Sequence, residues 1–333
     1  MSTATKPTVV RYGEAIRAAI AAEMRDDESV VLIGIDVGAS GGIFTVTRGL
    51  IEEFGAERVR DTPISEMAFV GAAVGAAATG LRPIVEIMFM DFLGVCFDPL
   101  LNQASKLRYM TGGNLSFPVV FRTQTGAGRS SGAQHSQSLE AVVSHVPGLK
   151  VVLPGTVEDA YGLMRLAIQD PNPVVYIENR QLYGRKLEGE LPDLDGPLPI
   201  GKARVVRPGS DVSIIAWSRM VEVAVTAAEQ LVGDGVQAEV IDLRSLVPMD
   251  MATVIESVSK TSRAVVVHEA VVDFGAGAEV VARIVENAFE MLDAPPARVG
   301  APPVPLPFSP PLEEACIPGV EQVLKAVRRS LAP

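Results

Sequence analysis

Residues 61–89, DTPISEMAFVGAAVGAAATGLRPIVEIMF, contain the turn, the helix and the strand that decide the fold class. Small residues fill the stretch from Glu66 to Thr79, which predicts a buried helix closed by Gly80. The run that follows, Arg82–Phe89, predicts a buried strand because apolar and β-branched residues dominate it. A helix that leads directly into such a strand is typical of a parallel sheet covered by helices.

The same alternation of helices and strands continues on both sides of this stretch. Before residue 179, helices are predicted at 12–24, 93–110 and 157–169, and strands at 30–37, 118–122, 149–153 and 174–178. Residues 179–198, rich in Gly, Pro and charge, predict a linker. After it, strands are predicted at 212–217, 238–243 and 264–268, helices at 221–232 and 277–291, a Pro-rich surface stretch at 294–311 and a last helix at about 319–331. We expect an α/β protein of two domains, 1–190 and 200–333.

Composition excludes several classes of protein. The 333 residues are 48% apolar, which is enough for sizeable cores. There are 40 acidic and 29 basic residues, a net charge of −11, and such a surface argues against nucleic acid or an anionic membrane as a partner. No run of 18 apolar residues occurs, and the only cysteines, Cys96 and Cys316, lack metal-ligand spacing. We therefore expect a reduced, cytoplasmic protein.

Motifs of self-contained enzymes are absent from the sequence. There is no HExxH, GxSxG or Walker A pattern, and the glycine-rich segments 126–132 and 275–277 lack dinucleotide-binding spacing. This argues against a nucleotide-binding α/β protein. Gly233-Asp-Gly235 begins like the thiamine-diphosphate motif, but residues 255–268 contain no closing Asn, so an ordinary turn is the simpler interpretation.

Three features each have a structural and a functional interpretation. Two helical glycines, Gly71 and Gly75, indicate close packing either inside one subunit or across a subunit interface, since glycine costs a helix about 1 kcal/mol relative to alanine. The turn 61–66 places a carboxylate at the start of that helix, for N-capping or for chemistry. Polar residues 132–137 form either a solvated loop or part of a site.

Along nearly its whole length the chain resembles one family. It is the beta subunit of the thiamine-diphosphate-dependent decarboxylating component of 2-oxo acid and acetoin dehydrogenase complexes. The matching segments occur in order: 41–50 (GGIFTVTRGL), 61–89, 106–113 (KLRYMTGG), 132–138 (GAQHSQS), 145–154 (HVPGLKVVLP), 167–174 (AIQDPNPV), 238–250 (AEVIDLRSLVPMD), 265–270 (VVVHEA) and 307–315 (PFSPPLEEA). The resemblance favours the functional interpretation of the turn and of the polar loop.

The resemblance also implies an architecture and partners. It implies a parallel-sheet pyrimidine-binding domain followed by a transketolase C-terminal-like α/β domain. An alpha subunit would carry the complete motif for Mg²⁺ and the diphosphate, forming an α2β2 heterotetramer with thiamine diphosphate between the chains. The glycine-containing helix fits such an interface. A lipoyl-bearing acyltransferase component would be the second partner.

Site residues are carried over from the matching motifs. Glu66 would place its carboxyl beside the aminopyrimidine ring, with Ile64 and Phe92 as apolar walls. His135 would move a proton after bond cleavage and assist acyl transfer to the lipoyl group. A structural K⁺ would be held by five residues, several through backbone carbonyls: Val119, Ala167, Ile168, Asp170 and Asn172.

The chain departs from the family at one position, and three segments bear on the substrate. The family's GEDV strand end reads GIDV at 34–37, so Ile35 replaces a glutamate of the acidic path that links the two active sites. Residues 94–96, 101–103 and 122–128 resemble those of acetoin-cleaving members of the family. This resemblance implies acetoin as substrate, with pyruvate close behind and a branched-chain 2-oxo acid as a further alternative. A non-catalytic assembly subunit with the same fold is the competing interpretation.

Overall fold

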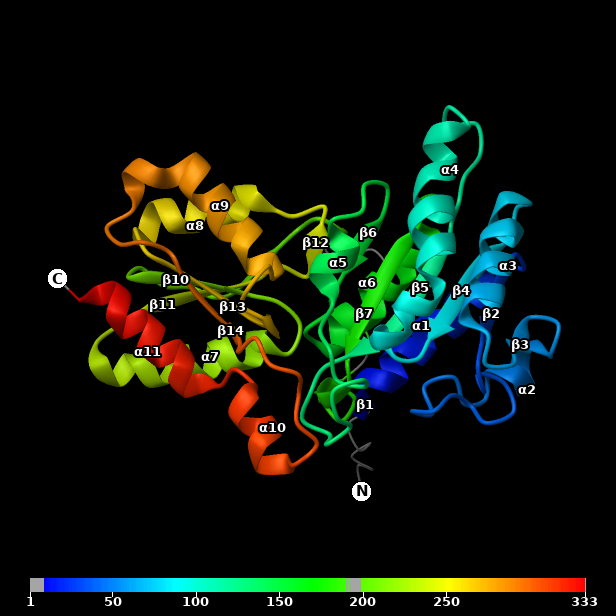
Figure 1. The fold of residues 1–333 in the computed structure, drawn as a ribbon, viewed down its shortest axis with the longest axis horizontal. Helices are drawn as coiled ribbons and strands as arrows, with labels where there is room; N and C mark the ends of the chain where they lie inside the picture. The colour runs from blue at the N-terminus through cyan, green and yellow to red at the C-terminus, as the bar shows by residue number, and fades with distance from the viewer. Residues whose placement is uncertain (1–8, 190, 192–198, 333) are drawn as a thin grey trace, which may run out of the picture.

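The computed structural model describes residues 9–189, 191 and 199–332, and within them two large sheets dominate. Residues 1–8, 190 and 192–198, which include the predicted domain boundary and part of the predicted linker, lie outside the described residues. Figure 1 shows the two sheets side by side along the long axis of the molecule. The strands are mostly parallel and helices cover both sheets, which confirms the predicted α/β class. Among the described residues no helix is long and apolar enough to cross a membrane.

The first sheet has seven strands in the order β12-β6-β7-β5-β4-β2-β3. Their bounds are β2 Val30–Gly34, β3 Val59–Asp61, β4 Arg82–Ile87, β5 Val120–Thr125, β6 Lys150–Val152, β7 Val174–Asn179 and β12 Ser245–Val247. Every pair is parallel except β12 with β6. Successive residues of β2 enter different cores: Val31 and Ile33 pack with α3 (Glu66–Ala78), whereas Val30 and Leu32 pack with α1 (Tyr12–Asp26) and α6 (Val157–Gln169). Both faces of the sheet are therefore covered.

The second sheet has five strands in the order β14-β13-β10-β11-β9, and only β9 is antiparallel. The strands are β9 Arg204–Arg207, β10 Val212–Ala216, β11 Ala238–Asp242, β13 Ala264–Val271 and β14 Ala297–Ala301. In Figure 1, α8 (Met251–Thr261) and α9 (Ala276–Ala288) lie on one side of this sheet. On the other side lie α7 (Met220–Leu231) and α11 (Val320–Leu331).

Several elements differ from the sequence prediction. The strand predicted at 30–37 ends at Gly34, since Asp36 turns the chain with φ 56°. The helix predicted at 93–110 consists of a 3₁₀ segment η1 (Met90–Cys96), a π segment η2 (Pro99–Ala104) and α4 (Ser105–Met110). The predicted linker contains η3 (Arg180–Leu182) and β8 (Lys186–Glu188), which pairs with β1 (Val9–Arg11). Elements absent from the prediction are β3, β9, β12, β14, α8, α2 (Leu50–Phe54), α5 (Glu140–Ser144) and α10 (Pro310–Cys316).

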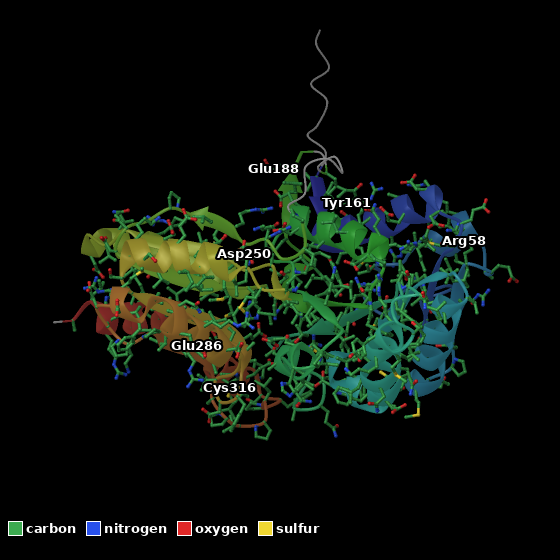
Figure 2. All side chains as sticks on the ribbon, turned by 90° about the horizontal axis from the view of Figure 1, so that it is seen from above. Arg58, Tyr161, Glu188, Asp250, Glu286 and Cys316 are labelled. Atoms are coloured by element: carbon green, nitrogen blue, oxygen red, sulfur yellow. The ribbon has the colours of Figure 1, made fainter. Side chains whose placement is uncertain are left out.

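The two halves of the chain share both a sheet and a core. β12 follows β11 in the chain, yet it pairs with β6 at the edge of the first sheet. One apolar cluster runs through both halves, because Leu153 of the first half belongs to it together with Trp217 and Leu243 of the second. Figure 2, seen from above, shows side chains filling the space between the half that carries Tyr161 and the half that carries Asp250. The loops that lie between the two halves are therefore packed against side chains of both halves.

Candidate functional site

Glu66, the first residue of α3, is buried without a hydrogen-bond partner among the described residues. Its exposed fraction is 7%. The N-capping interpretation is wrong for Ser65, because that side chain makes no cap hydrogen bond and instead donates to the Pro63 carbonyl at 3.1 Å. Burial and, to a smaller degree, the Glu66 carboxylate raise the pKa of the Cys96 thiol to about 12. Glu66 therefore lies close to η1, the segment that also carries Phe92.

Two exposed apolar side chains flank Glu66 in the sequence. Ile64, in the turn before α3, is 82% exposed, and Met67, one residue after Glu66, is 56% exposed. Exposed apolar side chains that form a contiguous patch mark places where a ligand or another protein chain binds. Within this chain, the wall predicted at Ile64 is open to solvent on its outer side.

His135 and Phe92 are brought together as predicted for one site. The imidazole meets the rings of Phe89 and Phe92 edge-on, with centroids 5.4 and 5.3 Å away. The loop that carries His135 is also fastened to η1, since the backbone N–H and the side-chain amide of Gln137 both donate to Asp91 Oδ1, at 3.2 and 2.9 Å. Glu66, Phe92 and His135 thus converge around η1.

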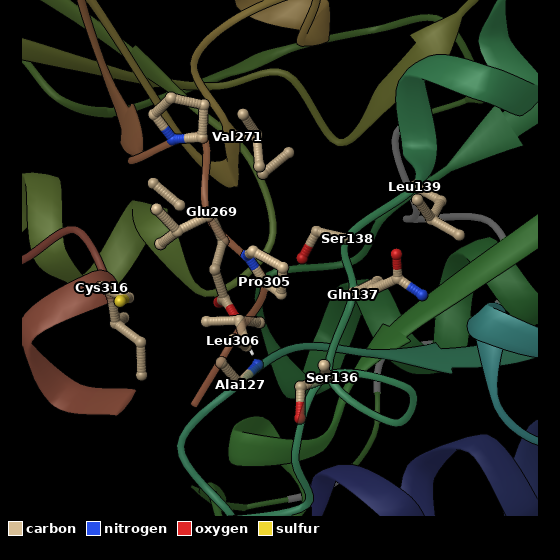
Figure 3. Close-up of a pocket in the computed structure, with 16 residues that line it drawn as sticks. Ala127, Ser136, Gln137, Ser138, Leu139, Glu269, Val271, Pro305, Leu306 and Cys316 are labelled. Atoms are coloured by element: carbon tan, nitrogen blue, oxygen red, sulfur yellow. Dashed lines mark hydrogen bonds between the residues drawn. The ribbon is translucent and has the colours of Figure 1, made fainter. Parts of the chain in front are cut away.

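A cavity of about 370 Å³ lies behind the His135 loop, between the two halves of the chain (Figure 3). Ser136, Gln137 and Ser138 line one wall, and residues of the C-terminal half, including Glu269 and Cys316, line the other. Glu269 accepts a hydrogen bond from the Ala127 N–H at 2.7 Å and another from the Asn179 amide at 2.9 Å. The cavity therefore borders on the contacts that hold the loop in place.

The residues predicted to hold K⁺ gather at the end of α6. Val174 N–H donates to the Val119 carbonyl at 2.9 Å, which brings Val119 to the loop that contains Asp170 and Asn172. Asp170 Oδ1 accepts from the backbone and side chain of Asn172, at 2.9 and 2.8 Å, and Oδ2 forms an ion pair with Lys150.

The end of α6 also accepts from a cation of this chain. The Ile168 carbonyl accepts from the Arg82 guanidinium at 3.0 Å. Among the residues that the structure describes, no group of three or more His, Cys, Asp or Glu side chains could hold a metal ion. Any cation at the end of α6 would depend on backbone carbonyls and the single carboxylate of Asp170.

A buried charge cluster in the first sheet was not predicted. Arg122 on β5 pairs with Glu86 on β4 and Glu178 on β7, and all three side chains are at most 2% exposed. Tyr183 donates to Glu178 at 2.5 Å. Burial raises the pKa of both glutamates, and the guanidinium opposes that rise. Polar residues inside apolar strands were the available signal, but only the strand order shows that the three share one site.

Models of two known domain families match the chain. The model of the transketolase pyrimidine binding domain matches residues 9–186, and that of the transketolase C-terminal domain matches residues 201–323. Among solved structures, one titled "Split gene transketolase, inactive beta4 tetramer" superposes with a TM-score of 0.80 at 25% identity, covering 97% of this chain and 98% of that one.

Relatives with higher identity are beta subunits of two enzymes. Pyruvate dehydrogenase E1 component subunit beta-2, mitochondrial, of Oryza sativa subsp. japonica is 46% identical over 99% of this chain and 88% of its own length. Acetoin:2,6-dichlorophenolindophenol oxidoreductase subunit beta of Cupriavidus necator is 47% identical over 95% of this chain and 96% of its own length. The resemblance drawn from the sequence is confirmed. The chain belongs to the transketolase-like family of dehydrogenase beta subunits that includes those of pyruvate dehydrogenase E1 and the acetoin oxidoreductase.

Proposed function

We propose that this chain is the beta subunit of a thiamine-diphosphate-dependent enzyme that cleaves acetoin or decarboxylates a 2-oxo acid and passes the acyl group to a lipoyl domain. One observation carries the proposal: a buried carboxyl without a protein partner, Glu66, lies close to the aromatic segment that contacts His135. Beta subunits of a pyruvate dehydrogenase and of an acetoin oxidoreductase are 46% and 47% identical to the chain.

The residues around Glu66 fit the pyrimidine half of the cofactor. Thiamine diphosphate, when bound, supplies the carbon nucleophile of its thiazolium ring. Glu66 would hold the proton at the pyrimidine ring nitrogen, and its lack of any other partner leaves it available for that bond. Phe92 and Ile64 would form the apolar walls that exclude water from the ring.

An alpha subunit would complete the site. The sequence lacks the closing Asn of the motif that binds the diphosphate and Mg²⁺, so these groups would be held mainly by the partner. The exposed Ile64 and Met67 offer that partner an apolar contact beside Glu66. We expect an α2β2 heterotetramer in which each cofactor lies between one alpha and one beta chain.

His135 would act on the reacting atoms rather than on the cofactor's binding. Its imidazole makes T-shaped contacts with two aromatic rings, and an imidazole nitrogen can give or take a proton. In that position it would donate or accept a proton after bond cleavage and assist transfer of the acyl group to the lipoyl group. A K⁺ ion at Val119, Ala167, Ile168, Asp170 and Asn172 would be structural and distant from this chemistry.

Binding of the cofactor tests the proposal directly. Thiamine diphosphate and Mg²⁺ are titrated by calorimetry into the chain alone, into its alpha partner alone, and into the mixture. We expect binding only in the mixture, whereas tight binding by the isolated chain would contradict a shared site. A mixture that assembles without binding the cofactor would instead identify a non-catalytic assembly subunit.

Substrate choice needs a second measurement on the assembled enzyme. Acetoin, pyruvate and a branched-chain 2-oxo acid are compared with 2,6-dichlorophenolindophenol as artificial acceptor and then with a lipoyl domain. We expect the highest kcat/KM with acetoin. A preference for pyruvate would leave the role of Glu66 unchanged and correct the substrate alone.

A further inference from the structure

Arg180, in η3 directly after β7, binds the backbone of the His135 loop at both of its ends. Its Nη2 donates to the Gly126 carbonyl at 2.5 Å and to the His135 carbonyl at 2.6 Å. Its Nη1 donates to Ser131 Oγ at 3.2 Å, in the middle of the loop. One guanidinium therefore joins residues nine positions apart in the sequence, and one of them is His135 itself.

The guanidinium also binds the aromatic ring that His135 contacts. It lies 4.9 Å from the centroid of Phe89, and that ring meets the imidazole edge-on at 5.4 Å. Arg180 is only 3% exposed, and its Nε has no partner among the described residues. Burying a guanidinium is costly unless its hydrogen bonds and its charge are compensated. Here two carbonyls, the Ser131 hydroxyl and one ring face compensate it, and two of these groups, the His135 carbonyl and the Phe89 ring, belong to the surroundings of the imidazole.

Two carboxylates bind the first part of the loop separately from Arg180. Glu313 of α10 accepts hydrogen bonds from the N–H groups of Gly128 and Ser130, both at 2.8 Å. Glu269 accepts from the N–H of Ala127 at 2.7 Å. These carboxylates come from the C-terminal half, and within the described part of the chain neither forms a hydrogen bond with His135. Arg180 and Glu313 therefore bind the same loop, but only Arg180 also binds His135. Glu313 can thus serve as the control for Arg180.

We propose that Arg180 is a positioning residue that sets the orientation of the His135 imidazole against Phe89 and Phe92. The proposal rests on the role proposed for His135 in the reaction. Arg180 acts through two groups, the His135 carbonyl and the Phe89 ring, which fix the backbone of His135 and one side of its imidazole. Misplacing a catalytic group by about 1 Å can cost on the order of 10²-fold in rate.

The first experiment observes the imidazole without the cofactor. The chain has three histidines, so ¹³Cε1-histidine labelling gives three signals, which His135→Ala, His145→Ala and His268→Gln assign. We expect Arg180→Gln to shift and broaden the His135 signal while leaving the His145 signal unchanged. Glu313→Gln, the matched control, should leave the His135 signal in place. Equal changes in both variants, or none in Arg180→Gln, would overturn the proposal.

The second experiment is a double-mutant cycle on the assembled enzyme with a lipoyl acceptor. Arg180→Gln should lower kcat by about 10²-fold with little change in KM, and should add little further loss in a His135→Ala background. Full additivity would show that Arg180 does not act through His135. Arg180→Lys, which keeps the buried charge, serves if the Gln variant does not fold, and should lose less activity because an ammonium can still donate to the His135 carbonyl.

The two experiments separate this inference from the function on which it rests. If His135→Ala retained full activity, the proposed role of His135 would be wrong, yet the histidine signals would still report whether Arg180 positions the ring. If His135→Ala were inactive while the His135 signal ignored Arg180→Gln, only the positioning role would be lost.

Discussion

Glu66 is a carboxylate that the fold buries and leaves without a partner, and this defines the first prediction. Glu66→Gln should keep the fold but slow deuterium exchange at the thiazolium carbon of the assembled enzyme by orders of magnitude, because an amide cannot exchange the proton that the role requires. Exchange is followed by NMR after acid quench. Glu57→Gln, whose carboxylate is 99% exposed, is the control and should exchange like the wild type. Unchanged exchange in Glu66→Gln would remove the residue from this role.

His268 gives a residue-scale prediction on stability. It is fully buried and stacks on Trp217 with ring centroids 5.4 Å apart. Burial, and to a smaller degree the charge of Arg298, lowers the pKa of His268 from 6.5 to about 4. Between these values the unfolded chain binds a proton that the folded chain does not, so this residue's contribution to stability falls as the pH falls from 6.5 towards 4.

Urea unfolding of the wild type and of His268→Gln across that pH range measures the effect. The wild type should lose up to about 1.4 kcal/mol per pH unit more than the variant. Burial raises the pKa of Glu140 and of Asp242 to about 7, which acts in the opposite direction, but both groups are present in both proteins and cancel in the difference. Parallel curves for the two proteins would show that His268 is not the titrating group.

At the residue scale, sequence reasoning found the groups whose motifs are contiguous. Glu66 and His135 each lie in a short segment of distinctive residues, so a motif was enough to select them. Arg180 was not selected, because its partners at 126, 131 and 135 are distant in the sequence and its own segment looked like a linker. The Glu86–Arg122–Glu178 cluster was missed for the same reason: it depends on which strands become neighbours.

At the scale of elements, replacing a glycine of α3 should have opposite effects on the stability of the isolated chain and on its assembly with the alpha subunit. A methyl group added at Gly71 or Gly75 would meet nothing within 4 Å in this chain, so close packing inside one subunit does not explain these glycines. Gly75→Ala should raise the free energy of unfolding of the isolated chain by about 1 kcal/mol, because alanine favours a helix. The same change should weaken assembly with the alpha subunit if α3 packs at the interface.

Urea unfolding and analytical ultracentrifugation measure the two effects. Gly80→Ala is the control: Gly80 has φ +104°, so alanine there should destabilise the chain. Assembly of Gly75→Ala with wild-type affinity would exclude a tight interface at this helix position.

The end of α6 is the element to test for K⁺. If an ion binds the five predicted residues, the melting temperature should be higher in KCl than in LiCl at equal concentration, because the larger ion suits a site of carbonyl oxygens. Asp170→Asn should remove the difference. Asp98→Asn should keep it, because Asp98 is an exposed carboxylate that accepts a hydrogen bond from Asn102 and is not one of the predicted ligands. Equal melting temperatures in both salts would leave Arg82 and Lys150 as the cations of this region.

Prediction of the elements succeeded where one periodicity covers a whole element. α1, α3 and α6 have continuous apolar or small-residue patterns and appear close to the predicted bounds, whereas β5 begins two residues after the start of the strand predicted at 118–122. The segment 93–110 is not the one regular helix that was predicted, because Gly94 and Pro99 interrupt it and 3₁₀ and π turns accommodate them. The short edge strands β3, β9, β12 and β14 were missed because three to five residues carry too little pattern.

At the scale of the whole molecule, the prediction at Ile35 is about proton transfer between the two active sites of the proposed tetramer. The side chain is half-buried and packs against the apolar cluster that runs through both halves, where it can neither carry nor solvate a proton. We expect the two cofactors of the tetramer to activate at similar rates, and Ile35→Glu to make them unequal at some cost in stability from a buried carboxyl. Pre-steady-state activation kinetics decide this. Biphasic, half-of-sites activation in the wild type would contradict it and imply another acid path.

The position of β12 has a consequence for how genes of this type can be recombined. A chimera joined in the 190–200 segment would combine one parent's β6 with the other parent's Ser245–Val247, although the two strands must pair in register. Two residues of the donor strand, Ser245 and Val247, would then have to match a sheet edge that they did not evolve beside. Functional crossovers between diverged parents should therefore avoid the apparent linker and fall after residue 247, where β6 and its partner strand are inherited together.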